Sequence, residues 1–105
     1  MIKIYRKTSS VDKKSPYKIY LNDMELGTIM DGERKDFNLR SNSYKVKIVG
    51  GGFHSPEVNV SLSDDQIIQL ICYPAYKDTK FSKYIYKNIF GGEAIYLKVD
   101  KDFYL

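Results

Sequence analysis

Tyr44-Lys45-Val46-Lys47-Ile48 decides the fold class, because alternate residues are apolar and the residues between them are charged. A β-strand sends successive side chains to opposite faces of its sheet, so this stretch predicts a strand with one buried and one solvated face. The same alternation recurs at Ile2-Lys3-Ile4, Tyr17-Lys18-Ile19, Val58-Asn59-Val60 and Ile95-Tyr96-Leu97-Lys98-Val99. We therefore expect a protein built from half-buried strands.

The size and composition of the chain predict one globular domain over residues 1–105. Of its 105 residues, 43% are hydrophobic and 29% are charged, which is typical of a chain that forms a core rather than a disordered one. Ten tyrosines and five phenylalanines are many for this length. Tyrosine favours strands, so this abundance supports a β fold before it supports binding.

Turn residues separate the alternating stretches every 8–12 residues or so, a spacing that is typical of sandwiches and barrels. Asp31-Gly32 is the strongest hairpin signal, because both residues tolerate the positive φ of a type I′ turn. The stretch 66–73 is apolar in both phases, which predicts a central strand covered on both faces. The expected strands are 1–7, 17–21, 24–30, 33–39, 44–49, 58–62, 66–73 and 93–105.

We thus predict an all-β fold, an antiparallel β-sandwich of seven to eight strands with an Ig-like or transthyretin-like arrangement. One short helical or irregular excursion near residues 78–90 interrupts it. Asp78 or Thr79 can cap a helix there, and Gly91-Gly92 can end it. An irregular excursion is the alternative, because Tyr84-Ile85-Tyr86 is β-prone. The apolar stripe that predicts the helix consists of Phe81, Tyr84, Ile85 and Ile89.

This excursion is the best candidate for function, because it combines lysines with aromatic side chains that could anchor a protein partner. A purely structural interpretation is that Phe81, Ile85 and Ile89 seal one end of the sandwich while the lysines keep it soluble. We expect protein contact or self-association, through this segment or an edge strand. The candidate interaction residues are Tyr76, Lys80, Phe81, Lys83, Tyr84, Tyr86, Lys87 and Phe90.

The uneven charge leaves a second hypothesis open. The net charge is +4, and residues 1–20 hold six Lys or Arg residues against one Asp. An anionic polymer such as nucleic acid, or an anionic membrane, could bind the basic N-terminal strand and the lysines of 77–87. An ordinary solvated surface accounts for the same charges. Salt discriminates the hypotheses, because polyanion affinity falls steeply with ionic strength.

The residue types that carry catalysis and metal binding are scarce. His54 is the only histidine and Cys72 the only cysteine, which is too few for a usual zinc site. We expect His54 to lie in a loop without a catalytic partner, Cys72 to be a small buried hydrophobe, and Asp64-Asp65 to form a turn. Gly50-Gly51-Gly52 lacks the ending of a phosphate loop. We expect no catalytic, metal or cofactor residues and no small-molecule substrate.

The first residues of the chain and its longest apolar run indicate where in the cell the protein is expected. Lys3, Arg6 and Lys7 interrupt any signal-peptide pattern at the start. The longest apolar run, 67–73, is far shorter than the roughly 20 residues that span a bilayer. We therefore expect a cytoplasmic protein.

A series of strand and turn motifs fills the middle of the chain. In order, they are Ile19-Tyr20-Leu21-Asn22-Asp23, Gly27-Thr28-Ile29, Phe37-Asn38-Leu39, Tyr44-Lys45-Val46-Lys47-Ile48, Gly52-Phe53 and Val58-Asn59-Val60. From Tyr17 to about Leu70 this order resembles the PEGA-type β-sandwich repeat. The resemblance implies a non-catalytic module of a kind often attached to other domains at cell surfaces.

Overall fold

Nine strands and one helix make up residues 1–100, the part of the chain that the computed structural model describes. The predicted strand over 93–105 is found as Ile95–Val99, and its residues from 101 onward lie outside the described part. The elements are β1 (Ile2–Arg6), β2 (Tyr17–Leu21), β3 (Met24–Ile29), β4 (Arg34–Phe37), β5 (Asn42–Gly50), β6 (Phe53–His54), β7 (Val58–Leu62), β8 (Ile68–Pro74), α1 (Lys80–Asn88) and β9 (Ile95–Val99).

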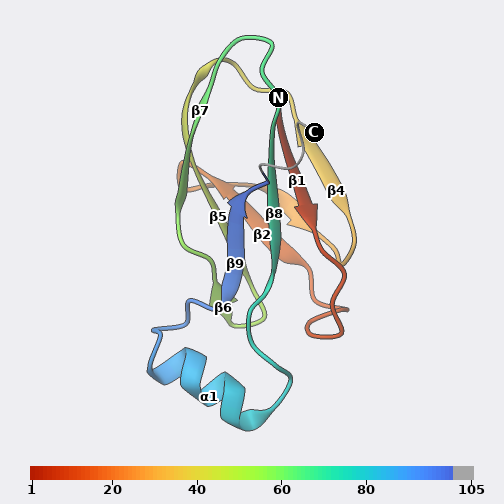
Figure 1. Ribbon diagram of the computed structural model, residues 1–105, viewed down its shortest axis with the longest axis vertical. Helices are drawn as coiled ribbons and strands as arrows, with labels where there is room; N and C mark the ends of the chain where they lie inside the picture. Colours follow the sequence, from red (N-terminus) through yellow and green to blue (C-terminus); the bar gives the residue numbers. More distant parts are fainter. Residues whose placement is uncertain (101–105) are drawn as a thin grey trace.

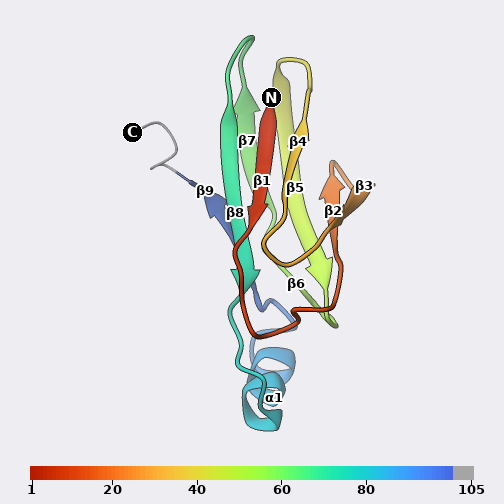
Figure 2. The same cartoon turned by 90° about the vertical axis from the view of Figure 1, so that its right-hand side faces the viewer.

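The strands form two sheets (Figures 1 and 2). One sheet has four strands in the order β4-β1-β8-β9, and the other has five, in which β3-β2-β5-β6 are neighbours and β7 also pairs with β5. The expectation of a chain that is mostly strands with one short helix is confirmed. The predicted number of seven to eight strands is too low, because the two-residue strand β6 has no alternation of its own to reveal it.

The expectation of purely antiparallel pairing is wrong. β1 and β8 run parallel, with Ile2 opposite Ile68 and Arg6 opposite Cys72. Side chains alternate with a period of two in parallel and antiparallel strands alike, so the pattern carries no information on strand direction. The parallel pair is made by the first strand and one much later in the chain.

The expected hairpin at Asp31-Gly32 is also wrong, because β3 and β4 belong to different sheets. A tight turn does form there, closed by a hydrogen bond from the Glu33 amide to the Met30 carbonyl at 3.0 Å. Only Gly32 has a positive φ, whereas a type I′ turn needs two such residues. Asn22-Asp23, with φ of 49° and 66°, makes the type I′ hairpin between β2 and β3.

Alternation places the core as predicted. Ile2 and Ile4 of β1 are buried, and so are Val46 and Ile48 of β5 in the other sheet. The buried apolar side chains of both sheets join one hydrophobic cluster, and each contributes about 1.5–3 kcal/mol relative to an exposed position. β8 is central in its sheet, as expected, between β1 and β9.

The glycine triplet is a hairpin turn that permits close packing. Gly51 and Gly52 have φ of 62° and 82° and reverse the chain between β5 and β6. Gly50 lies directly against the second strand, since a Cβ atom there would overlap Tyr17 Cδ1. The triplet thus serves the fold.

The helix α1 lies beyond one end of the strands, whereas the N-terminus lies toward the other end (Figures 1 and 2). The predicted excursion near 78–90 is therefore a helix, which extends the long axis of a molecule measuring 45 × 24 × 23 Å. It covers the face of neither sheet.

Candidate interaction site

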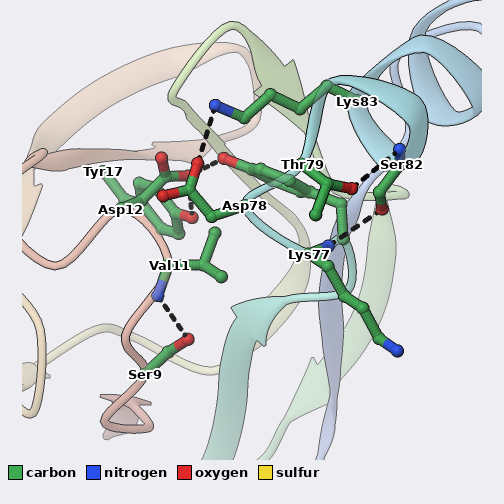
Figure 3. A network of polar contacts seen from close by, with 10 residues as sticks. Ser9, Val11, Asp12, Tyr17, Lys77, Asp78, Thr79, Ser82 and Lys83 are labelled. Atoms are coloured by element: carbon green, nitrogen blue, oxygen red, sulfur yellow. Dashed lines mark hydrogen bonds and ion pairs between the residues drawn. The ribbon is translucent and has the colours of Figure 1, made fainter.

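The start of α1 is held by two hydrogen bonds that share Ser82 (Figure 3). Thr79 Oγ1 accepts one from the Ser82 amide at 3.1 Å, and Ser82 Oγ accepts one from the Lys77 amide at 2.9 Å. Lys83 Nζ lies 2.9 Å from Asp78 Oδ1, and this hydrogen bond raises the pKa of Lys83. Thr79 is thus the capping residue, one of the two candidates that the sequence offered.

The end of α1 is tied to β6. The Gly92 amide donates to the Tyr86 carbonyl at 2.8 Å, and the Gly92 carbonyl accepts from the His54 amide at 2.9 Å. The Ala94 amide then donates to the His54 carbonyl at 2.9 Å. The C-terminal end of the helix is therefore tied to a strand, whereas the bonds at its N-terminal end stay within residues 77–83.

His54 lies in β6 rather than in the loop that we expected, because the glycine turn folds it back onto Val49 of β5. Its ring nitrogens lie 3.0 Å from the Ser55 carbonyl oxygen and 3.3 Å from the Gly91 carbonyl oxygen. Both ring nitrogens thus lie within hydrogen-bond distance of main-chain carbonyl groups.

The structural interpretation, in which Phe81, Ile85 and Ile89 seal one end of the sandwich, is wrong for two of these three residues. Phe81 is 74% exposed, Tyr84 62% and Ile89 66%, and only Ile85 is half-buried. The side chain that packs against the core is Tyr86, which lies on a different side of the helix from Phe81. An apolar stripe at helical spacing predicts the helix, but it does not determine which side of the helix packs against the core.

The predicted interaction residues divide into two groups. Tyr76 is a core residue, 3% exposed, with its ring centre 4.4 Å from that of Phe53. Its expected role as a contact for a partner is therefore wrong, since the residue precedes the helix and packs in the hydrophobic core. Tyr86 is half-buried, 6.4 Å from Tyr76 between ring centres. The remaining six are exposed, namely Lys80, Phe81, Lys83, Tyr84, Lys87 and Phe90.

A buried polar network anchors the segment that leads into α1. Asp12 Oδ2 accepts hydrogen bonds from the hydroxyl of Tyr17 at 2.8 Å and from that of Tyr76 (Figure 3 shows Asp12 and Tyr17). Burial, followed by these hydrogen bonds, raises the pKa of both tyrosines well above the usual range. The hydroxyl groups therefore stay protonated and keep donating to Asp12.

Arg6 completes this network, although its role was not predicted from the sequence. Its side chain is fully buried, and its guanidinium donates to the carbonyl groups of Asp12, Ser15 and Ile29 at 2.6–3.0 Å. The guanidinium also stacks over the Tyr17 ring at 3.7 Å. The sequence did contain an indication that Arg6 is buried, because Arg6 follows Ile2 and Ile4 in the inward phase of the first strand.

Several of the basic side chains in the N-terminal region already contact other groups of the protein. Arg6 is buried, Lys3 lies 3.6 Å from Asp36, and Lys18 lies 3.5 Å from Glu25. Lys7 Nζ lies 5.4 Å from the centre of the Tyr73 ring, so four of the six N-terminal bases have partners in the fold. On α1, by contrast, Lys80 and Lys87 are exposed and form no ion pair within residues 1–100.

Comparisons with protein-family models, with curated proteins and with solved structures found no match. Within residues 1–100, α1 is too short and too polar to cross a membrane. The geometry thus defines a two-sheet β protein with a firmly anchored helix that presents aromatic and lysine side chains to solvent.

Proposed function

We propose that this chain is a non-enzymatic β-sandwich module of the Ig-like kind that binds a protein partner through the exposed side of α1. One observation carries the proposal: α1 is capped at its start and tied to β6 at its end, yet it has no fully buried residue, and Phe81 and Tyr84 stay exposed while Tyr86 packs against the core. A helix of nine residues gains little stability from its own hydrogen bonds in water, so helices of this length ordinarily form by burying an apolar side. Here that side is left for another molecule to cover.

The proposed contact consists of Lys80, Phe81, Tyr84 and Lys87, which we call the α1 surface. Residues three and four positions apart are neighbours on a helix, so these side chains form one continuous patch. Burying an exposed aromatic side chain contributes about 1.5–3 kcal/mol, and aromatic residues are frequent anchors of protein interfaces. The two lysines attract acidic groups. The matching partner therefore has an apolar pocket with an acidic rim.

An anionic polymer or membrane is the second candidate, because lysines beside Phe81 and Tyr84 also suit stacking on bases or insertion among lipid headgroups. Four of the N-terminal bases already contact other groups of the protein, which reduces the basic surface available to such a ligand. The protein partner is therefore favoured. The two candidates differ in their response to salt, as contacts to phosphates weaken steeply with ionic strength.

The test is a selection from a displayed library of random peptides against the immobilised chain. We expect enriched peptides with acidic residues around an apolar centre. Their affinity should fall at least about tenfold for Phe81→Ser/Tyr84→Ser. Met24→Ser is the matched control, because Met24 is an exposed apolar residue (68%) on β3 and should leave the affinity unchanged.

Two outcomes would contradict the proposal. In the first, the double variant binds the selected peptides as tightly as the wild type. In the second, no peptide is enriched, while vesicles containing phosphatidylserine bind at about 50 mM salt and are released at about 500 mM. The second outcome would assign the α1 surface to membranes.

A further inference from the structure

The strand β9 has an open edge within residues 1–100, where it pairs only with β8. Hydrogen bonds fix which main-chain groups face that edge. The Asp100 amide donates to the Gln69 carbonyl at 2.8 Å, and the Ala75 amide donates to the Ala94 carbonyl at 2.7 Å. Main-chain groups alternate in direction along an antiparallel strand, so those of Ile95, Leu97 and Val99 point away from β8.

A groove of about 390 Å³ runs beside this edge. Residues 94–98 line its length, Pro56 contributes to its wall, and Tyr86 and Phe90 of the helix line it as well. The space lies next to main-chain donors and acceptors that have no strand partner in the described chain. It therefore has the properties of a site for an additional strand.

We propose that a second copy of this chain occupies the edge, with the two β9 strands antiparallel and Leu97 of one opposite Leu97 of the other. Ile95 then pairs with Val99 of the second copy, and both strands pair along their whole length. The contact is isologous, as a two-fold dimer requires, and it joins two four-stranded sheets into one.

The two neighbouring registers, centred on Lys98 and on Tyr96, are less favourable. A pair centred on Lys98 would place two lysines directly opposite each other, where like charges destabilise. A pair centred on Tyr96 would extend to Glu93, which already forms a bridge with His54. The register centred on Leu97 avoids both problems.

The side chains are complementary in the proposed register. On the outer face, Tyr96 lies opposite Lys98 of the second copy, and the two-fold axis repeats this cation–π pair. Within one copy Lys98 Nζ already lies 5.3 Å from the Tyr96 ring centre, and Tyr96 stacks on Tyr73 at 5.0 Å. On the inner face, apolar residues meet apolar residues.

Two of the other edge strands, β4 and β3, are protected in ways that β9 is not. β4 carries Arg34, Lys35 and Asp36, and charges along an edge strand oppose the addition of another strand. The pairing of β3 with β2 shifts register between Ile19 and Tyr20, and such irregularities also disfavour strand addition. Lys98 is the only charged residue within β9.

The experiment is analytical ultracentrifugation of the full chain at concentrations up to about 1 mM, with charge variants at the predicted cross-strand pair. We expect a reversible dimer. Tyr96→Lys should weaken it about tenfold, because the new lysine faces Lys98 of the second copy and the two-fold axis repeats this repulsion. Tyr96→Glu should dimerise at least as well as the wild type, and Tyr96→Lys/Lys98→Glu should restore the dimer. Tyr96 is 44% exposed, so circular dichroism should show unchanged folding.

Amide hydrogen exchange tests the main-chain contact separately. The Leu97 and Val99 amides should exchange more slowly as the protein concentration rises. The Lys98 amide, which faces β8, should change little and serves as the internal control. A chain that is monomeric throughout, or a dimer indifferent to Tyr96→Lys, would overturn the proposal.

The dimer and the α1 surface can fail independently. Phe81→Ser/Tyr84→Ser should leave the dimer intact if the copies meet at β9. If that variant abolishes the dimer while Tyr96→Lys does not, the copies meet at α1 and the β9 contact is wrong. Loss of peptide binding without loss of the dimer would support both proposals.

Discussion

The guanidinium of Arg6 lies 3.7 Å from the centre of the Tyr17 ring, and the two residues come from strands of different sheets. The hydroxyl group of Tyr17 donates a hydrogen bond to Asp12. Asp12 in turn accepts from Tyr76, the residue that leads toward α1. One chain of contacts thus links both sheets to the segment that carries the helix.

Replacing Arg6 with methionine should destabilise the protein by about 3 kcal/mol, because three carbonyl groups lose a charged donor in the interior. Urea unfolding measures the effect. Lys14→Met is the control, as Lys14 is exposed and its replacement should change the stability by less than about 0.5 kcal/mol. Equal stability of Arg6→Met and the wild type would show that the network contributes nothing to folding.

Stability should fall as the pH rises above about 9. Burial raises the pKa of the Cys72 thiol from 9.0 to about 12, so the unfolded chain releases this proton first. Between these values the free energy of unfolding should decrease by up to about 1.4 kcal/mol per pH unit. Tyr17 and Tyr76, whose pKa values are also raised, should add to the loss above about pH 10.

The variant Cys72→Ala isolates the thiol in this pH dependence. Its stability should fall less steeply than that of the wild type between about pH 9 and 10, because only the onset of the contribution from the two tyrosines remains. Urea titrations at several pH values measure both slopes. Parallel slopes for the variant and the wild type would contradict the assignment to Cys72.

Gly50→Ala should destabilise the protein by about 2 kcal/mol, because the added Cβ would overlap Tyr17 Cδ1 and lie 3.1 Å from the Tyr17 Cα. The backbone atom cannot rotate away. Gly27→Ala is the matched control, since a Cβ there meets nothing within 4 Å. Thermal unfolding should separate the two variants clearly, and similar melting temperatures would count against close packing at the glycine turn.

The two sides of α1 should differ in their effect on stability. Tyr86→Ala should cost about 2 kcal/mol, because it removes packing against the core. Phe81→Ser should change stability by less than about 0.5 kcal/mol, as Phe81 is 74% exposed and the two residues have similar helix propensities. If Phe81→Ser proved as destabilising as Tyr86→Ala, Phe81 would be a core residue after all, and the α1 surface would lose its central side chain.

Strand positions followed well from alternation, and the predicted strands 17–21 and 58–62 agree with β2 and β7 at both ends. Alternation reports which side chains are buried, and burial is a local property of each strand. The partner of each strand depends on contacts distant in sequence. This is why the parallel β1–β8 pair and the separation of β3 from β4 were not predicted.

In the candidate site, too, local features could be predicted from the sequence, whereas contacts between distant segments could not. The helix and the Thr79 cap followed from the sequence, because helical spacing and capping are local. The side that faces the protein did not, since Tyr86 is selected by its contacts with Tyr76 and the core. Arg6 was missed because a charged residue in the inward phase needs carbonyl partners from other segments, and these partners have no sequence pattern.

The pairing of Ile2 with Ile68 has a consequence for how this protein is made. During synthesis, β2, β3 and β5 can associate while the chain is still growing, since they are near neighbours in sequence. β1 has to wait for β8 before it is flanked on both sides, and long-range pairs of this kind form slowly. A ribosome-bound chain that stops before Ile68 should therefore hold one sheet nearly assembled and one edge of its first strand exposed to chaperones.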